Sequence, residues 1–114
     1  MKLFICILFL GLIGFNNNSS SSEKIINSLK DGKKLIFIRH AYAPGNGDPE
    51  NFRIDDCSTQ RNLNQQGINQ SKIIGSFFKN NYIKIDEVLS SEWCRCKDTA
   101  RIAFKNFKTF NALN

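Results

Sequence analysis

The sequence LIFIRH, residues 35–40, decides the fold. Its first four residues form a continuous apolar run, which is typical of a strand buried on both faces of a parallel sheet. A second short strand is expected at 87–90, and apolar residues recur at helical spacing over 65–79 and 93–104. The order strand, helix, strand, helix predicts an α/β fold with parallel strands.

The segment 65–79 carries the clearest helix signals. Asn64 precedes the segment and is a candidate N-cap. Gly67 and Gly75 are expected to allow close packing of this helix against the sheet. One apolar stripe should face the core, and it consists of Ile73, Ile74, Phe77 and Phe78.

Residues 1–18 have the pattern of a secretory signal peptide. Lys2 precedes an apolar run over 3–15, and a tract of Asn and Ser follows. The run is shorter than the about 20 apolar residues that a transmembrane helix needs. A small-x-small cleavage sequence is not obvious, so an uncleaved N-terminal anchor remains an alternative. We expect an exported protein, periplasmic or extracellular.

The rest of the chain divides into a connector and one domain. Residues 19–33 are expected to hold the end of a polar linker and a short helix over 23–31. Residues 34–114 are expected to form the domain. Its long loop, 41–62, contains both prolines of the chain, and loops of this length in compact domains are usually functional.

The net charge and the cysteine spacing bear on nucleic-acid binding, disulfide formation and metal binding. The formal net charge is +6, but the lysines are scattered and no zinc-finger or basic-heptad spacing occurs, so we predict no nucleic-acid partner. In an oxidising compartment, Cys57 is expected to form a disulfide with Cys94 or Cys96. These cysteines and His40 do not have the usual Cys-x-x-Cys spacing, so no metal site is predicted.

Three residues are expected to converge at one edge of the sheet. Arg39 and His40 follow the first strand, and Arg95 follows the second. Because ligands bind beyond the carboxyl ends of parallel strands, these side chains should share one site. Guanidinium groups bind phosphate and disfavour the charged imidazole, so the pattern favours a neutral histidine nucleophile for phosphoryl transfer.

Three blocks of the sequence carry a family resemblance. They are LIFIRHAYAP at 35–44, NLNQQGINQ at 62–70 and VLSSEWCRCKDTA at 88–100. Together they resemble the histidine phosphatase superfamily, in its phosphoglycerate-mutase-like branch 1. The resemblance implies a three-layer α/β/α fold with a mostly parallel sheet, and no cofactor.

The resemblance also assigns roles to residues. It makes His40 the phosphate-accepting nucleophile, with Arg39 and Arg95 as phosphate ligands. It places Asn46 where some mutase-like members contact phosphate. Arg61 is a candidate for the pocket mouth, although a surface charge beside a helix cap is an equal alternative.

Two features of the family pattern are missing from this sequence. The family has a second histidine in its C-terminal half, whereas His40 is the single histidine here. The family's acid usually follows the Thr-Ala helix, but no Asp or Glu follows Ala100. The simplest interpretation is a truncated chain with about the first half of the domain.

The resulting functional hypothesis is a hydrolase of phosphomonoesters or phosphohistidine. It would act on a small phosphorylated substrate through a phosphohistidine intermediate on His40. The alternatives are a non-catalytic module that binds phosphate or another anion, and an inactive fragment. The sequence gives no indication of the oligomeric state, and no membrane contact is expected beyond an uncleaved anchor.

Overall fold

A computed structural model describes residues 19–114, so the predicted signal peptide lies outside the described residues. The elements in chain order are α1 (Ser19–Lys30), a 3-10 helix (Cys57–Thr59), α2 (Gln65–Asn80), β1 (Leu89–Ser90), α3 (Cys94–Phe104), β2 (Lys108–Thr109) and a 3-10 helix (Asn111–Leu113). Within this range, no helix is long and apolar enough to cross a membrane.

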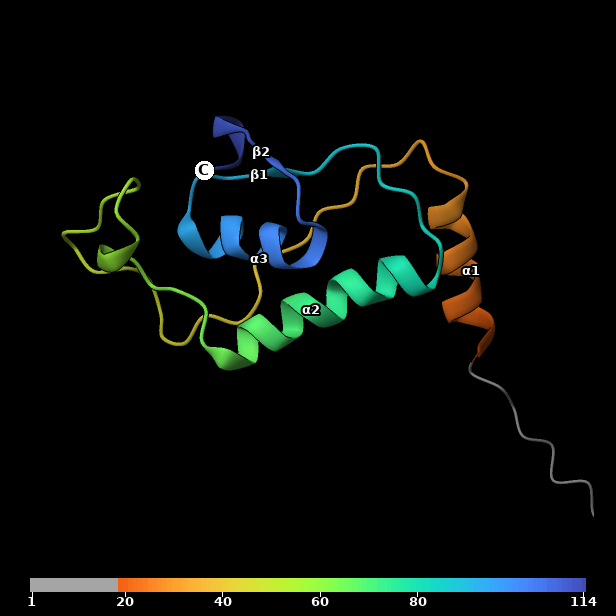
Figure 1. The fold of residues 1–114 in the computed structure, drawn as a ribbon, viewed down its shortest axis with the longest axis horizontal. Coiled ribbons are helices and arrows are strands. Elements are labelled where there is room, and N and C mark those ends of the chain that lie inside the picture. Colours follow the sequence, from red (N-terminus) through yellow and green to blue (C-terminus); the bar gives the residue numbers. More distant parts are fainter. Residues whose placement is uncertain (1–18) are drawn as a thin grey trace, which may run out of the picture.

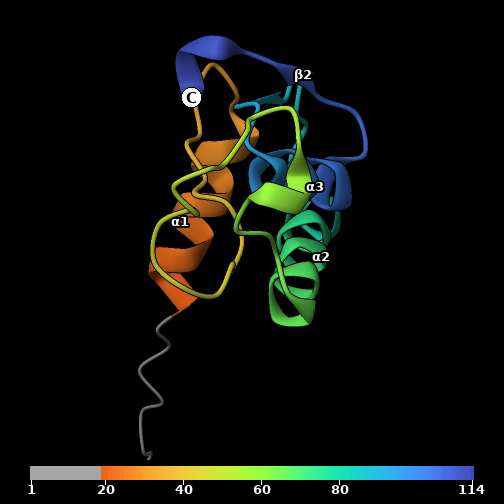
Figure 2. The ribbon, with the colours of Figure 1, turned by 90° about the vertical axis from the view of Figure 1, so that its left-hand side faces the viewer.

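The sheet of the described residues has two parallel strands. β1 pairs with β2 in the register Leu89 to Lys108, and α3 is the crossover between them, as parallel pairing requires. The helix α3 lies between this sheet and α2 (Figures 1 and 2). These elements agree with the predicted α/β class, whereas the three-layer arrangement stays a prediction.

The helix α2 begins where the sequence predicted. The Asn64 side chain accepts a hydrogen bond from the backbone N–H of Gly67 at 3.0 Å, which satisfies a donor that the first turn leaves free. The Asn64 cap is therefore confirmed, and the helix ends at Asn80, one residue beyond the predicted end.

The buried face of α2 differs from the predicted stripe. Phe78 is buried and packs edge-on against Phe104, with ring centroids 5.3 Å apart. Ile73 and Phe77, by contrast, are exposed. The reason is that glycines and a serine face α3 and the loop after His40, and these small residues let the backbones approach closely. The buried apolar residues of the described chain are Ala41, Ala43, Phe78, Ile83, Cys94 and Ala100.

Residues 35–38 do not form the predicted buried strand. The segment is extended but lacks ladder hydrogen bonds, and Leu35 and Phe37 are 87% and 82% exposed. Within residues 19–114, β1 pairs only with β2, so the segment has no strand neighbour. Its apolar run instead lines a groove of about 620 Å³ together with residues 83–91.

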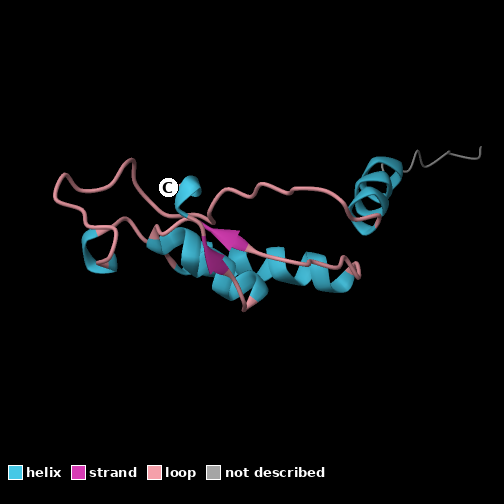
Figure 3. Cartoon of the chain, turned by 90° about the horizontal axis from the view of Figure 1, so that it is seen from above, coloured by secondary structure: helices cyan, strands magenta, loops and turns pink. Residues whose placement is uncertain are grey.

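The helix α1 starts at Ser19, four residues before the helix predicted from the sequence. The serines that were predicted as linker therefore form its first turn. Figure 3 shows α1 apart from the body formed by α2, α3 and the sheet. It therefore contributes little to the positioning of His40.

Candidate active site

The backbone just after His40 is held by side chains from both neighbouring helices. The N–H of Ala41 donates to Thr99 Oγ1 of α3 at 3.0 Å. The N–H of Tyr42 donates to Gln70 Oε1 of α2 at 2.8 Å. The carbonyl of Tyr42 lies so close to Gly67 that a Cβ there would overlap its oxygen. The three sequence blocks thus meet at residues 41–42.

This close approach leaves no room for a side chain at Gly67. In an ordinary helix interior, glycine to alanine stabilises a protein by about 0.5–1 kcal/mol. Here the methyl group would meet the Tyr42 carbonyl, so we expect Gly67→Ala to lower the free energy of unfolding by about 1–3 kcal/mol. Urea unfolding followed by circular dichroism measures this change. The exposed Ser76→Ala in the same helix is the control, and equal stability of the two variants would contradict the packing argument.

The position of the proton on His40 follows from one hydrogen bond. His40 Nδ1 lies 2.8 Å from the carbonyl oxygen of Ala41. A carbonyl can only accept, so Nδ1 carries the hydrogen. In the neutral imidazole, Nε2 is then the nitrogen with the free lone pair. Gln70 holds the N–H of the same peptide unit, the one between Ala41 and Tyr42, which couples α2 to the orientation of the ring.

The surroundings of His40 favour its neutral form. Partial burial lowers the pKa of His40 below its usual 6.5, and the cations of Arg95, Arg61 and Arg39 lower it further, in that order. The hydrogen bond to Ala41 acts in the opposite direction but does not outweigh them. The imidazole is therefore uncharged at neutral pH, as a nucleophile requires.

The lowered pKa of His40 can be measured directly, because this is the only histidine. A proton NMR titration should give a midpoint below 6.5 for the imidazole. The Arg95→Ala variant should move the midpoint upward, whereas Arg101→Ala, on the exposed side of α3, should leave it unchanged. Because the unfolded chain binds this proton more readily, the free energy of unfolding should fall as pH is lowered through 6.5. A wild-type midpoint at or above 6.5 would exclude this electrostatic picture.

Arg95 is a buried cation at the first turn of α3. Its side chain is 11% exposed. Nη1 donates to Asp48 Oδ1 at 2.9 Å, and the guanidinium lies 4.5 Å from the centroid of the Trp93 ring. Its Nε is buried without a hydrogen-bond partner among the described residues. A buried donor of this kind is costly to leave unpaired, so the atom is suited to an incoming anion.

Arg61 is held by the loop that follows His40. Its Nη1 donates to the carbonyl of Ala43 at 2.6 Å, and its Nε donates to the carbonyl of Gly47 at 2.9 Å. Its backbone N–H donates to Asp48 Oδ1 at 2.8 Å. The structure thus favours a position beside the site over the alternative of a free surface charge.

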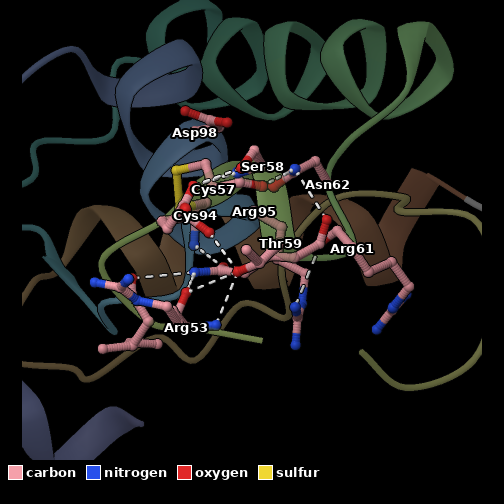
Figure 4. The surroundings of a disulfide bond; sticks show 12 residues. Arg53, Cys57, Ser58, Thr59, Arg61, Asn62, Cys94, Arg95 and Asp98 are labelled. Carbon is pink, nitrogen blue, oxygen red and sulfur yellow. Dashed lines mark hydrogen bonds between the residues drawn. A yellow bond between two sulfur atoms is a disulfide. The ribbon is translucent and has the colours of Figure 1, made fainter. Parts of the chain in front are cut away.

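A disulfide joins this loop to α3. Cys57 is bonded to Cys94, one of the two pairings that the sequence left open, with a Cα–Cα distance of 5.6 Å. Figure 4 shows the bond beside Arg95, which is the next residue of α3. The buried Gln60 adds a second link, because its Oε1 accepts from the N–H of Cys94 at 2.9 Å. The Gln60 side chain of the loop therefore caps the N-terminus of α3.

Two predicted site residues, Arg39 and Asn46, are exposed. Arg39 is exposed and makes the smallest of the three cationic contributions at His40. Asn46 is exposed on a turn between two glycines, Gly45 and Gly47, whose φ angles are +91° and +68°. The charges of Arg95 and Arg61 act on His40, and Asn46 lies on the exposed turn whose Gly47 carbonyl accepts from Arg61.

Sequence reasoning missed Asp48, Gln60, Gln70 and Thr99. Gln70 and Thr99 lie inside the quoted blocks, so the signal was present, but spacing does not reveal that they bind backbone amides. Asp48 and Gln60 lie in the long loop, where no periodicity marks a buried side chain.

Comparison with protein families gave one match. The family model of the histidine phosphatase superfamily (branch 1) matches residues 35–111. This range spans more than half of the chain and contains His40, Arg61 and Arg95. Comparisons with curated proteins and with solved structures found no match. This chain belongs to branch 1 of the histidine phosphatase superfamily.

Proposed function

We propose that this chain accepts a phosphoryl group on Nε2 of His40, as a hydrolase of phosphomonoesters or phosphohistidine would. The observation that carries the proposal is the hydrogen bond from Nδ1 to the Ala41 carbonyl at 2.8 Å. It leaves the Nε2 lone pair free in an imidazole that its surroundings keep neutral. Membership of the histidine phosphatase superfamily supports phosphatase chemistry.

In the proposed reaction, Nε2 attacks phosphorus while the bond from phosphorus to the leaving group breaks. The positive charges of Arg95 and Arg61 stabilise the charge on the transferring oxygens. Water then attacks the phosphohistidine, which releases phosphate and regenerates His40. Arg39 at the exposed side and Asn46 on the loop are proposed as additional contacts to the substrate. A three-layer α/β/α arrangement is the fold proposed for the whole catalytic domain.

The proposal includes export to an oxidising compartment, periplasmic or extracellular. The disulfide between Cys57 and Cys94 supports this proposal, because such bonds persist where thiols are not kept reduced. The substrate would then be a small phosphorylated molecule in that compartment.

Trapping of the covalent intermediate tests the proposal. A radiolabelled aryl phosphomonoester is a suitable donor, because its leaving group departs as a stable phenolate and needs no proton from the protein. The full chain is mixed with the donor and quenched in alkaline denaturant, since phosphohistidine hydrolyses in acid. Label on the protein supports the proposal. Phosphate binding without label would indicate an anion-binding module, and a chain without a cooperative melt would indicate an inactive fragment.

A further inference from the structure

Asp48 carries a largely buried carboxylate to which the proposed reaction gives no role. Its side chain is 9% exposed. One oxygen, Oδ1, accepts both from Arg95 Nη1 at 2.9 Å and from the backbone N–H of Arg61 at 2.8 Å. A single carboxylate oxygen thus links the two arginines that lie beside His40.

Asp48 is not suited to donate a proton. Burial raises the pKa of Asp48, but the hydrogen bonds from the Arg61 N–H and the Arg95 side chain, with the charges of both residues, lower it more. The carboxyl group is therefore ionised and acts as an acceptor. Its contribution must come through the groups that it binds.

Asp48 binds Arg95 through Nη1 and leaves the Nε atom at the other edge of the guanidinium without a hydrogen-bond partner among residues 19–114. A guanidinium can bind an oxyanion with Nη1 and Nη2, or with Nε and Nη2. Arg53 shows the second mode in this chain, since its Nε and Nη2 bind the two oxygens of Asp55 at 3.3 and 3.0 Å. In Arg95 the Nη1 end is taken by Asp48, while the buried Nε has no partner among residues 19–114.

We propose that Asp48 is a positioning residue, which holds Arg95 by Nη1 so that the Nε and Nη2 edge is presented to the phosphoryl group. This inference rests on the proposed function, because it assumes that a phosphoryl group is the ligand of Arg95. The bond to the Arg61 backbone places the carboxylate itself, and the disulfide anchors the same loop beside Arg95. This role requires an acceptor oxygen at the position of Asp48 Oδ1, and it does not require the negative charge.

Three variants of the full chain separate position from charge. Asp48→Asn keeps an acceptor oxygen in place and removes the charge. Asp48→Glu keeps the charge and moves it, and Asp48→Ala removes both. The matched control is Asp55→Asn, which breaks an exposed pair between an aspartate and Arg53.

Two measurements are made on each variant. The first is the side-chain Nε–H signal of Arg95 in a proton–nitrogen NMR spectrum, assigned with Arg95→Ala. The second is the dissociation constant of inorganic phosphate by titration calorimetry. We expect the wild type, Asp48→Asn and Asp55→Asn to show a slowly exchanging Nε–H signal and similar affinities. Asp48→Ala and Asp48→Glu should lose the signal and bind phosphate about tenfold more weakly, which is the lower end of the loss seen when a group that orients a metal-binding side chain is removed.

The outcomes distinguish this inference from the proposed function. If the wild type does not bind phosphate but the Nε–H signal follows the expected pattern, the phosphate site fails and the positioning role stands. If phosphate binds equally well to all variants, or if Asp48→Asn loses as much as Asp48→Ala, the positioning role is overturned. Should Asp48→Ala and Asp48→Glu lack a cooperative melt, Asp48→Ser, whose side chain is too short to keep an acceptor at Arg95 Nη1, takes their place. Loss of signal and affinity in Asp48→Ser beside their retention in Asp48→Asn supports the role, and equal values in the two variants contradict it.

Discussion

Replacement of His40 by Asn is expected to abolish covalent labelling of the chain by a phosphoryl donor. The asparagine amide nitrogen takes the place of Nδ1 and can still donate to the Ala41 carbonyl, so the backbone should keep its position. The variant lacks any atom at Nε2, and loss of a nucleophile lowers rates by about three orders of magnitude or more. Quantified label after an alkaline quench measures the effect.

The neighbouring Tyr42→Phe variant provides a matched control for His40→Asn. The Tyr42 ring is exposed, and its contacts to α2 run through the backbone, which the change leaves intact. This variant should label like the wild type. Undiminished label on His40→Asn would place the phosphoryl group on another residue and end the proposal of a histidine nucleophile.

Loss of the disulfide is the second large expected effect. The bond joins residues separated by 37 positions, and a cross-link of this kind contributes about 2–4 kcal/mol, chiefly by restricting the unfolded chain. We expect the variant Cys57→Ser, made together with Cys96→Ser, to melt roughly 10 °C or more below the wild type. Thermal unfolding followed by circular dichroism gives the value.

The single variant Cys96→Ser is the reference for the disulfide experiment. Cys96 is a free thiol of intermediate exposure, and its replacement in both proteins removes the chance of a wrong pairing with Cys94. The single variant should melt close to the wild type. Coincident melting curves of the single and double variants would mean that the disulfide adds nothing to stability.

Local signals in the sequence predicted the helices well. The cap at Asn64 and the helix α3 follow from residue preferences that act within a few positions, and the structure confirms both. The pairing of Cys57 needed geometry, because Cys94 and Cys96 are nearly equivalent in the sequence. Only the direction of each side chain at the start of α3 separates them.

The exposed segment 35–38 shows where the sequence could not decide. An apolar run indicates a tendency to be buried, but burial also requires a neighbour, and among the described residues no strand pairs with this segment. Asp48 illustrates the opposite case. Polar residues in a loop are usually assigned to the surface, yet two donors from distant positions draw this carboxylate inside.

The hydrogen bonds and close packing that hold the backbone at residues 41–42 have a consequence for protein engineering. Anyone who transplants this histidine to a new scaffold must copy more than a histidine and a few arginines. The recipient needs a hydroxyl and an amide oxygen that accept from two consecutive peptide N–H groups. It also needs a helix with a glycine at the point where the backbone after the histidine crosses it. Without these backbone contacts, the Ala41 carbonyl would not stay in place to bind Nδ1, and the imidazole would no longer be held with Nε2 free.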